Sequence, residues 1–334
     1  MSALGWSDLF EEQVTAEELA LDRMRIATIH RSRMTAVSQH GPVRLVLPAQ
    51  ANTAEYAVGD WVLVDPATRL VARRLDRKTV LQRHTEGGRV PQLIAANVDT
   101  LFITTSCNED LNPARLERYL ALANEAGATP VIVLTRADKV ADTAPYRAQV
   151  AGLQRGLAVV ALNAKSPEAA AILAPWCGAG RTIALVGSSG VGKSSLLNTL
   201  SDKPPEAAQL TGSIRESDAR GRHTTTSRSL HPIVGGGWVI DTPGMRTLHV
   251  SDSALGLERL FAEITELAPL CRFRDCTHAH EPGCAVQAAI SAGKLDPARL
   301  ERWRKLLEEN RSNTPVQTGP RGNRKSRNVA DRRR

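Results

Sequence analysis

The sequence predicts a multidomain protein with an N-terminal β barrel, a central α/β domain and a C-terminal, mainly α-helical metal-binding domain. Strand-like runs crowd residues 24–89, strands and helices alternate from residue 98 around a glycine-rich loop, and cysteine and histidine cluster at residues 271–284. A length of 334 residues allows two or three domains. We divide the chain into an acidic extension, the barrel, the α/β domain, the metal-binding domain and a basic tail that is disordered when free, at residues 1–22, 23–90, 91–248, 249–311 and 312–334.

The composition is that of an ordinary globular protein, with 42% hydrophobic and 23% charged residues. No apolar run approaches the roughly 18 residues that a membrane span needs. The first ten residues lack the Lys or Arg of a secretory signal. Cysteines are too few and too clustered for a disulfide scaffold. We expect a monomeric protein of the reducing cytoplasm, without a membrane partner.

The net charge of +8 is unevenly divided along the chain. Residues 1–22 carry −6, residues 23–89 carry +7, residues 311–334 carry +7, and the stretch between the basic regions is neutral. This distribution favours nucleic acid as the partner, although basic tails that only aid solubility are the alternative. The Arg-rich end either contacts RNA phosphates or is a dispensable solvated tail; its basic residues are Arg321, Arg324, Lys325, Arg327 and Arg332–Arg334.

The barrel is predicted from short runs of β-branched and alternating residues separated by turn signals. Barrels of this size and strand number are typically of the OB type, which commonly binds nucleic acids. Aromatic residues are scarce here, with Tyr56 and Trp61, so phosphate contacts are favoured over base stacking. A purely structural barrel is the alternative. The expected strands lie at residues 24–30, 34–39, 43–48, 61–65, 70–75 and 79–82.

Alternating strands and helices after residue 98 predict a parallel sheet covered on both faces. The C-terminal region is helical again, with Asp296 as the expected N-cap of an amphipathic helix at residues 297–309. We expect sheet strands at residues 99–104, 131–134, 157–162 and 182–186, and helices at residues 112–126, 145–153 and 192–200.

The strongest motif is Gly-Ser-Ser-Gly-Val-Gly-Lys-Ser at residues 187–194, which fits the phosphate-loop pattern G-x-x-x-x-G-K-[ST]. Glycines let consecutive backbone N–H groups face a phosphate, and the helix N-terminus adds partial positive charge. Lys193 is predicted to reach the β- and γ-phosphates and to act in catalysis, and Ser194 to coordinate Mg²⁺. The predicted phosphate-binding residues are Gly187, Ser188, Ser189, Gly190, Val191, Gly192, Lys193, Ser194 and Ser195.

A second nucleotide-binding segment is Trp-Val-Ile-Asp-Thr-Pro-Gly at residues 238–244. Asp241 ends an apolar strand, where P-loop NTPases place the second carboxylate associated with Mg²⁺. Gly244 lets a backbone N–H approach the γ-phosphate. Asp-x-Pro-Gly is also ordinary turn chemistry, but its place downstream of a phosphate loop favours the nucleotide-binding interpretation.

The choice of nucleobase depends on Thr-Arg-Ala-Asp at residues 135–138, where GTPases carry Asn-Lys-x-Asp. The carboxylate of Asp138 is predicted to accept hydrogens from guanine N1 and N2, a donor pair that adenine lacks. A Thr hydroxyl can still hydrogen-bond and an Arg stem can cover the base, yet this departure weakens the prediction of strict guanine selection. The predicted base-binding residues are Thr135, Arg136, Ala137 and Asp138, with Asn163, Ala164 and Lys165 as the loop that completes the pocket.

The base-binding segments come before the phosphate loop, which reverses the order of an ordinary GTPase. Circular permutation preserves such a pocket when the old termini lie close together. The sequence therefore predicts a circularly permuted GTPase domain. The permutation also joins the segment at residues 241–244 directly to the C-terminal domain. A change in the contact with the γ-phosphate is therefore expected to be transmitted to that domain.

A metal site is predicted from four soft or borderline ligands, Cys271, Cys276, His278 and Cys284, which lie within 14 residues. Three thiolates and an imidazole suit tetrahedral Zn²⁺, and a site filled by protein ligands is structural. His280 is a rival fourth ligand, and reduced cysteines without a metal are the alternative. Cys107 and Cys177 are expected to be ordinary small apolar residues.

Together, the permuted order and four segments resemble the RsgA (YjeQ) family of GTPases that depend on the small ribosomal subunit. The segments are GSSGVGKS, GRHTTT at residues 221–226, DTPG and CRFRDCTHAHEPGC, and the resemblance covers roughly residues 24–310. It implies an OB barrel, a permuted GTPase domain, GTP or GDP with Mg²⁺, and one structural Zn²⁺ held by His278 rather than His280. It also implies hydrolysis of GTP, stimulated by the small subunit during its late maturation, and contact with rRNA.

The catalytic residue is predicted from the same resemblance. Met245 stands where Ras-type enzymes carry a Gln that orients water, and a thioether cannot do so. The resemblance implies that His223 fills this role, and that one of Thr224–Thr226, for which we take Thr225, reaches Mg²⁺. Two other classes stay open: a P-loop ATPase or kinase, and an RNA assembly factor that binds nucleotide with little turnover.

Overall fold

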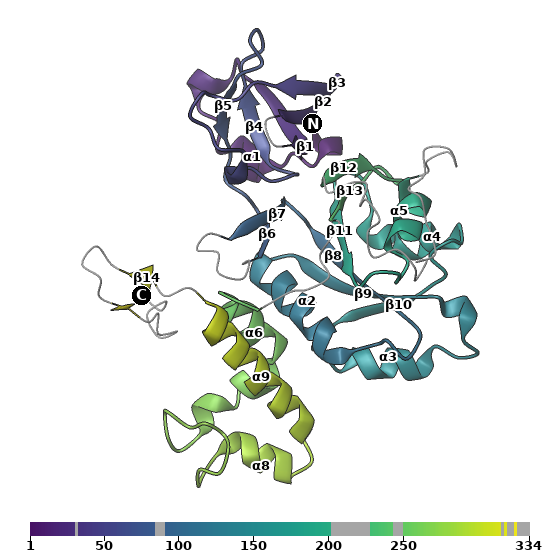
Figure 1. Ribbon diagram of the computed structural model, residues 1–334, viewed down its shortest axis with the longest axis vertical. Helices are drawn as coiled ribbons and strands as arrows, with labels where there is room; N and C mark the ends of the chain where they lie inside the picture. Colours follow the sequence, from purple (N-terminus) through teal and green to yellow (C-terminus); the bar gives the residue numbers. More distant parts are fainter. Residues whose placement is uncertain are drawn as a thin grey trace, which may run out of the picture.

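The structure is a computed structural model that describes residues 1–30, 33–83, 91–201, 228–242 and 250–314, together with two short strands in the basic tail, β14 (Gln317–Thr318) and β15 (Arg324–Lys325). The barrel, the α/β domain and the C-terminal helices follow one another along the longest axis of the molecule (Figure 1). The α/β domain therefore contacts both of the other parts.

The barrel is built from five strands, which match the first five of the six expected: β1 (Asp22–His30), β2 (Arg33–Ser38), β3 (Gly41–Leu45), β4 (Trp61–Val64) and β5 (Val71–Arg74). Strand β1 pairs with both β2 and β4, which in turn pair with β3 and β5, always antiparallel. A bridge between Val46 and Leu70 closes the ring. Met24, Ile26 and Met34 fill its interior.

The expectation that residues 79–82 add a strand to this barrel is wrong. Strand β6 (Val80–Arg83) instead pairs with β7 (Gln92–Ala96) in a separate two-stranded sheet. Leu81 and Ile94 of this sheet are buried in the apolar core that α2 shares. The hydrophobic face of the hairpin therefore packs in a core formed mainly by the α/β domain, which also takes in Ala27 and Val58 of the barrel.

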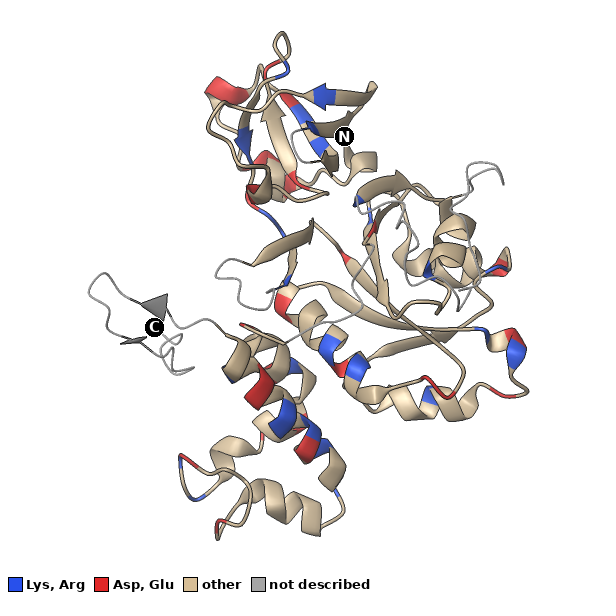
Figure 2. Cartoon of the chain, in the orientation of Figure 1, with Lys and Arg blue, Asp and Glu red and all other residues tan. Residues whose placement is uncertain are grey.

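The acidic N-terminal segment packs on the barrel. Leu4 and Phe10 are buried against Trp61, Leu63 and Leu75. Three ion pairs join the acidic stretch to barrel arginines, at 2.9, 2.7 and 3.0 Å: Glu11–Arg23, Glu18–Arg73 and Asp22–Arg69. Figure 2 shows segments coloured as acidic and basic residues close together in this region. Part of the positive charge of the barrel is thus neutralised within the chain.

The central sheet has the strand order β10-β9-β8-β11-β13-β12. The first five strands are parallel and β12 is antiparallel to β13, which confirms the predicted parallel sheet with one antiparallel edge added. A single pair of residues, Thr28 and Ser229, links β12 to the barrel strand β1. The strands are β8 (Thr100–Ser106), β9 (Thr129–Thr135), β10 (Ala158–Ala161), β11 (Thr182–Gly187), β12 (Ser229–Pro232) and β13 (Trp238–Asp241).

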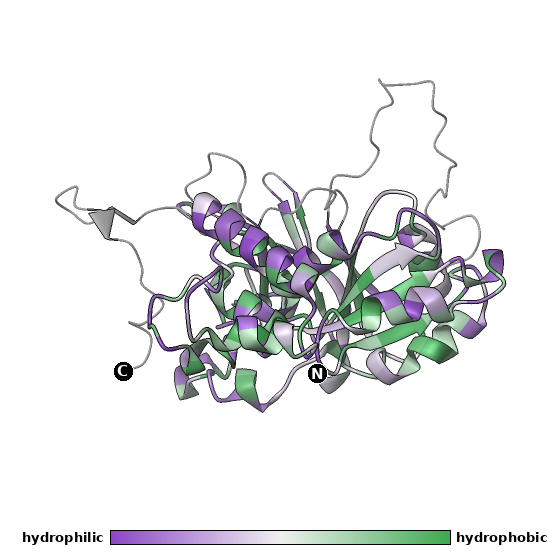
Figure 3. Ribbon diagram, turned by 90° about the horizontal axis from the view of Figure 1, so that it is seen from below, coloured by the Kyte–Doolittle hydropathy of each residue, from purple (hydrophilic) through white to green (hydrophobic). Residues whose placement is uncertain are grey.

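Helices cover both faces of this sheet. On β8, Leu101 and Ile103 face the core formed with α2 (Pro113–Ala126) and α3 (Ala144–Ala151), while Phe102 faces α4 (Glu168–Leu173) and α5 (Lys193–Ser201). Successive side chains of a strand point to opposite faces, so an uninterrupted apolar strand feeds two cores. Figure 3 shows hydrophobic strands lying inside a more hydrophilic outer layer of helices.

The barrel and the α/β domain meet at a buried arginine. Arg25 is 1% exposed and donates hydrogen bonds to the carbonyl oxygens of Leu4, Gly59 and Asn97 and to the Thr182 hydroxyl. Burial lowers the pKa of Arg25 to about 10, so the side chain stays charged at neutral pH. One guanidinium thereby joins the N-terminal segment, the barrel and strand β11.

The C-terminal domain consists of α6 (Ala254–Leu260), α7 (Ala262–Thr265), α8 (Ala285–Ser291) and α9 (Pro297–Asn313). The Asp296 carboxylate accepts from the Ala298 N–H at 2.9 Å and caps α9, as predicted. Helix α6 packs so closely on α2 that a Cβ on Gly256 would lie 2.2 Å from the Ala121 carbonyl oxygen. The domain is therefore docked firmly on α2.

Candidate nucleotide-binding and metal sites

The phosphate-loop motif joins β11 to α5, as the sequence predicts. Three of its glycines have left-handed backbone angles, with φ of 139° at Gly187, 77° at Gly190 and 94° at Gly192. A Cβ on Gly187 would lie 2.1 Å from the Thr104 carbonyl oxygen. Both the backbone conformation and the close approach of β8 therefore require glycine here.

The charge of Lys193 is held at the loop. Its Nζ donates to the carbonyl oxygen of Gly187 at 2.9 Å and to that of Ser188. Ser189 is exposed, whereas Ser194 and Ser195 are half-buried in the first turn of α5. The ammonium and the helix N-terminus thus concentrate positive potential on one loop, which is the electrostatic requirement of a phosphate site.

The two residues that depart from the Asn-Lys pattern both contact the phosphate loop. The Thr135 hydroxyl, which is fully buried, lies 2.6 Å from the Val191 carbonyl oxygen and 3.1 Å from that of Thr105. Arg136 Nη2 donates to the Gly190 carbonyl oxygen at 2.7 Å. Thr and Arg therefore tie the base-binding segment to the phosphate loop, which motif comparison alone could not show.

The remaining residues predicted to form the base pocket gather at the same edge. Ala164 is buried, and its Cβ lies 3.6 Å from the point where a Cβ on Gly192 would be. Its carbonyl oxygen accepts a hydrogen bond from the Thr199 hydroxyl of α5 at 2.8 Å. Asn163 Oδ1 accepts from the Lys165 N–H, which fixes the turn. The Asp138 side chain, 36% exposed, lies 3.6 Å from the exposed Lys139 ammonium. A partly exposed carboxylate at this edge can meet a ligand.

Strand β13 brings Asp241, in the predicted second nucleotide-binding segment, beside the strand that enters the phosphate loop. Asp241 is in register with Leu185 of β11, two residues before the phosphate loop begins. The Thr242 hydroxyl donates to the Leu185 carbonyl oxygen at 2.6 Å and fixes the strand end. Predicted residues Gly244, His223 and Thr225 lie outside the described residues, as do Met245 and the basic residues of the tail except for the backbone of β15.

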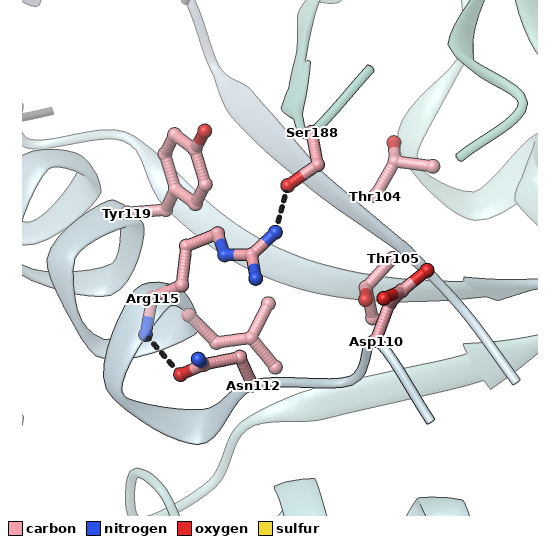
Figure 4. A pocket seen from close by; sticks show the side chains of 8 residues that line it. Thr104, Thr105, Asp110, Asn112, Arg115, Tyr119 and Ser188 are labelled. Carbon is pink, nitrogen blue, oxygen red and sulfur yellow. Dashed lines mark hydrogen bonds between the residues drawn. The ribbon is translucent and has the colours of Figure 1, made fainter. Parts of the chain in front are cut away.

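A contact that sequence reasoning missed lies on the other side of the loop. Arg115, in the first turn of α2, donates to the Ser188 hydroxyl across a small polar pocket (Figure 4). Thr104, Thr105 and Asp110 also line this pocket. No motif marks Arg115, because an arginine at the start of an amphipathic helix is ordinary in sequence.

The four predicted metal ligands converge. Cys271, Cys276, His278 and Cys284 place their ligand atoms within 4.8 Å of one another. His278 Nδ1 lies 3.5 Å from the sulfurs of Cys271 and Cys284, and these sulfurs are 3.9 Å apart. A tetrahedral zinc site with Zn–S bonds of about 2.3 Å has edges of about 3.8 Å, so the donor set fits this ion. His278, and not His280, belongs to the group.

Surrounding groups favour the metal-binding form of two of these ligands, Cys271 and His278. Burial opposes ionisation of Cys271, but the backbone N–H groups of Ala285 and Val286 lower its pKa. Burial also lowers the pKa of His278, which keeps the imidazole neutral. Arg304 donates to the His278 carbonyl oxygen at 2.6 Å and Trp303 packs against its ring. Such contacts orient a ligand before the metal binds.

The phosphate loop, the base-binding segment contacting it and the position of that segment earlier in the chain define a circularly permuted P-loop GTPase domain. The family model of the RsgA GTPase matches residues 74–251. This chain belongs to the RsgA GTPase family.

Curated relatives agree over most of the chain. It is 66% identical over 322 residues to the small ribosomal subunit biogenesis GTPase RsgA of Mesorhizobium japonicum, covering 96% of this chain and 93% of that protein. It is 47% identical over 311 residues to RsgA 2 of Vibrio vulnificus, described by the same function, covering 92% and 87%.

Two solved structures share the fold. YjeQ from Thermotoga maritima matches with a TM-score of 0.63 and 24% identity, covering 86% of this chain and 98% of that structure. YloQ, described as a circularly permuted GTPase, matches with a TM-score of 0.61 and 21% identity, covering 91% and 99%.

Within the described residues, none of the helices has the length and hydropathy of a transmembrane segment.

Proposed function

We propose that this protein hydrolyses GTP to GDP and phosphate in the biogenesis of the small ribosomal subunit, with turnover stimulated by that subunit. The observation that carries the proposal is the pair of contacts from Thr135 and Arg136 to the phosphate loop. They support a nucleotide that lies with its base at Asp138 and its phosphates at the loop. The names of the curated relatives support the ribosomal role.

Each predicted residue has a part in holding the nucleotide. Asp138 reads the guanine, and Thr135 and Arg136 position its segment, while Ala137 and the turn formed by Asn163, Ala164 and Lys165 complete the base pocket. The loop N–H groups and Lys193 bind the phosphates. Ser194 and Asp241 are the residues that would hold Mg²⁺, whose charge neutralises the phosphate oxygens. The residues of the phosphate side are Gly187, Ser188, Ser189, Gly190, Val191, Gly192, Lys193, Ser194, Ser195, Asp241 and Gly244.

Hydrolysis needs a water in line with the bond between the γ-phosphorus and the bridging oxygen. The water oxygen bonds to phosphorus as that bond breaks, and GDP leaves with the bridging oxygen. We assign orientation of the water to His223, since Met245 cannot do so, and contact with Mg²⁺ in the GTP state to Thr225. Without its partner the enzyme turns over slowly, because the charge of the transition state is incompletely stabilised.

The C-terminal cluster serves as a structural zinc site in this proposal. Cys271, Cys276, His278 and Cys284, whose ligand atoms lie within 4.8 Å of one another, would fill all four positions of a tetrahedral zinc site and leave none for a substrate. The site fixes the loop between α7 and α8 and thereby the surface that the domain offers to the subunit. The basic tail supplies phosphate contacts to rRNA, and truncation at residue 311 is expected to flatten the salt dependence of subunit binding.

The test is GTP and ATP hydrolysis by the full chain, with and without purified small subunits. The proposal expects slow GTP hydrolysis alone and a large stimulation by subunits, abolished by His223→Ala with GTP binding intact. His40→Ala, at an exposed turn of the barrel, is the matched control and retains stimulation. Preference for ATP indicates a kinase or ATPase, and binding of GTP without turnover indicates a passive assembly factor. Normal stimulation of His223→Ala removes only the assignment of that histidine.

A further inference from the structure

One face of the phosphate loop is held by a residue far away in sequence. Arg115 and Ser188 are 73 positions apart, and Arg115 Nη1 donates to the Ser188 hydroxyl (Figure 4). Ser188 is the second residue of the loop, and its hydroxyl points toward Arg115 of α2 (Figure 4). The contact therefore ties the loop to the start of α2.

Ser188 is contacted through two different groups. Its carbonyl oxygen accepts from Lys193 Nζ, and its hydroxyl accepts from Arg115. In the proposed function the Lys193 ammonium binds the triphosphate, and it then no longer donates to the Ser188 carbonyl oxygen. The bond from Arg115 uses neither the backbone N–H groups of the loop nor Lys193, so it is compatible with bound nucleotide.

Arg115 projects from a helix that is fixed in place. Its own backbone N–H donates to Asn112 Oδ1 at 3.1 Å, which caps the start of α2. Further along the helix, the buried Glu117 pairs with two arginines of α9, Arg299 at 2.7 Å and Arg302 at 2.8 Å. A side chain on such a platform can hold a loop at a constant position.

We propose that Arg115 is a positioning residue for the phosphate loop, which it holds through Ser188 in the conformation that binds phosphates. The inference rests on the proposed function and names a further residue of the same site. A hydrogen bond with a charged donor is roughly twice as strong as a neutral one. Without this bond the free loop samples more conformations, so nucleotide binding costs more conformational entropy and the affinity falls.

The test is a double-mutant cycle on GDP and GTP affinity, measured with a fluorescent nucleotide analogue and the full chain. Arg115→Ala and Ser188→Ala are each expected to weaken binding about ten-fold, and the double variant no more than the single ones. In GTP hydrolysis by Arg115→Ala and by Ser188→Ala, KM is expected to rise while kcat changes by less than about two-fold. Arg115→Lys, which keeps a charged donor, recovers part of the loss.

Arg118→Ala is the matched control, because it cuts an ion pair of the same helix one turn away and leaves the loop contact in place. It is expected to keep wild-type nucleotide affinity. Should Arg115→Ala lower the stability of the chain, Ser188→Ala carries the test, since it leaves α2 intact.

Several results would overturn the inference. They are unchanged affinity in Ser188→Ala, additive effects in the cycle, or an equal loss in Arg118→Ala. If the charge of Arg115 acted without the contact to Ser188, Arg115→Lys would recover full nucleotide affinity and Ser188→Ala would leave it unchanged. That result also overturns the positioning role. Failure of the wild-type chain to bind GTP refutes the proposed function itself, whereas wild-type binding retained in Arg115→Ala refutes only this inference.

Discussion

Replacement of Arg299 by Met is expected to release α9 from the α/β domain. The guanidinium is 4% exposed, donates to Glu117 at 2.7 Å and to Glu263 at 2.6 Å, and also donates to the Leu153 and Leu260 carbonyl oxygens. It lies 4.0 Å from the ring centroid of Phe261. Its removal leaves several buried acceptors without their donor.

The size of the effect follows from this burial. Breaking a buried ion pair by removal of one partner costs about 3–5 kcal/mol. Arg302 still donates to Glu117 at 2.8 Å, which places the cost near the lower value. About 3 kcal/mol corresponds to a loss of protection in α9 of about 100-fold. Hydrogen exchange of peptides from α9, followed by mass spectrometry, measures this directly.

Two further variants make the test specific. Arg155→Met removes a two-pronged pair with Glu266 in which both side chains are more than half exposed, at 69% and 59%, and it is expected to leave protection of α9 unchanged. Combining Arg299→Met with Glu117→Leu restores most of the protection, because an apolar pair replaces the ions. Loss of protection no larger in Arg299→Met than in Arg155→Met would refute the reasoning.

Two other predictions concern zinc and pH. Chelation of zinc is expected to unfold residues 265–290 and to change the fluorescence of Trp303, which packs on His278, whereas a fully folded domain without measurable zinc contradicts the metal site. Hydrogen bonds from the Arg73 side chain and the Thr15 backbone lower the pKa of Glu18 to about 2, so its stabilising effect is complete above pH of about 4.5 and is lost as pH falls toward 2. Glu18→Gln should therefore lower the unfolding temperature at pH 7 and converge with wild type below pH of about 2, and a difference that persists there contradicts this assignment.

The sequence predicts best those features that depend on short stretches of chain. The four metal ligands lie within 14 residues, so their clustering marked the region that converges, and the family resemblance chose His278 over His280. The phosphate loop likewise follows from local glycine chemistry, since the angles at Gly187 and Gly192 are ones that other residues rarely adopt. In both cases the constraint and the residues that satisfy it are neighbours in sequence.

Several features that depend on distant pairing and carry no motif were not predicted. The hairpin of β6 and β7 has an apolar face that could cover a barrel or a helix equally well, and only the proximity of α2 decides between them. The acidic extension carries Leu4 and Phe10, but nothing in the sequence specifies the surface near Trp61 that buries them. The contact between Arg115 and Ser188 joins two ordinary residues, so it becomes visible only in three dimensions.

The account depends on one nucleotide lying between Asp138 and the phosphate loop. The most direct test is the exchange Asp138→Asn, measured as subunit-stimulated hydrolysis of GTP, xanthosine triphosphate and ATP. Xanthine carries an oxygen where guanine carries the 2-amino group, so the Asn amide donates where the carboxylate accepted. We expect activity with GTP to fall about 100-fold or more and activity with xanthosine triphosphate to appear. Unchanged GTP preference in this variant would contradict the account.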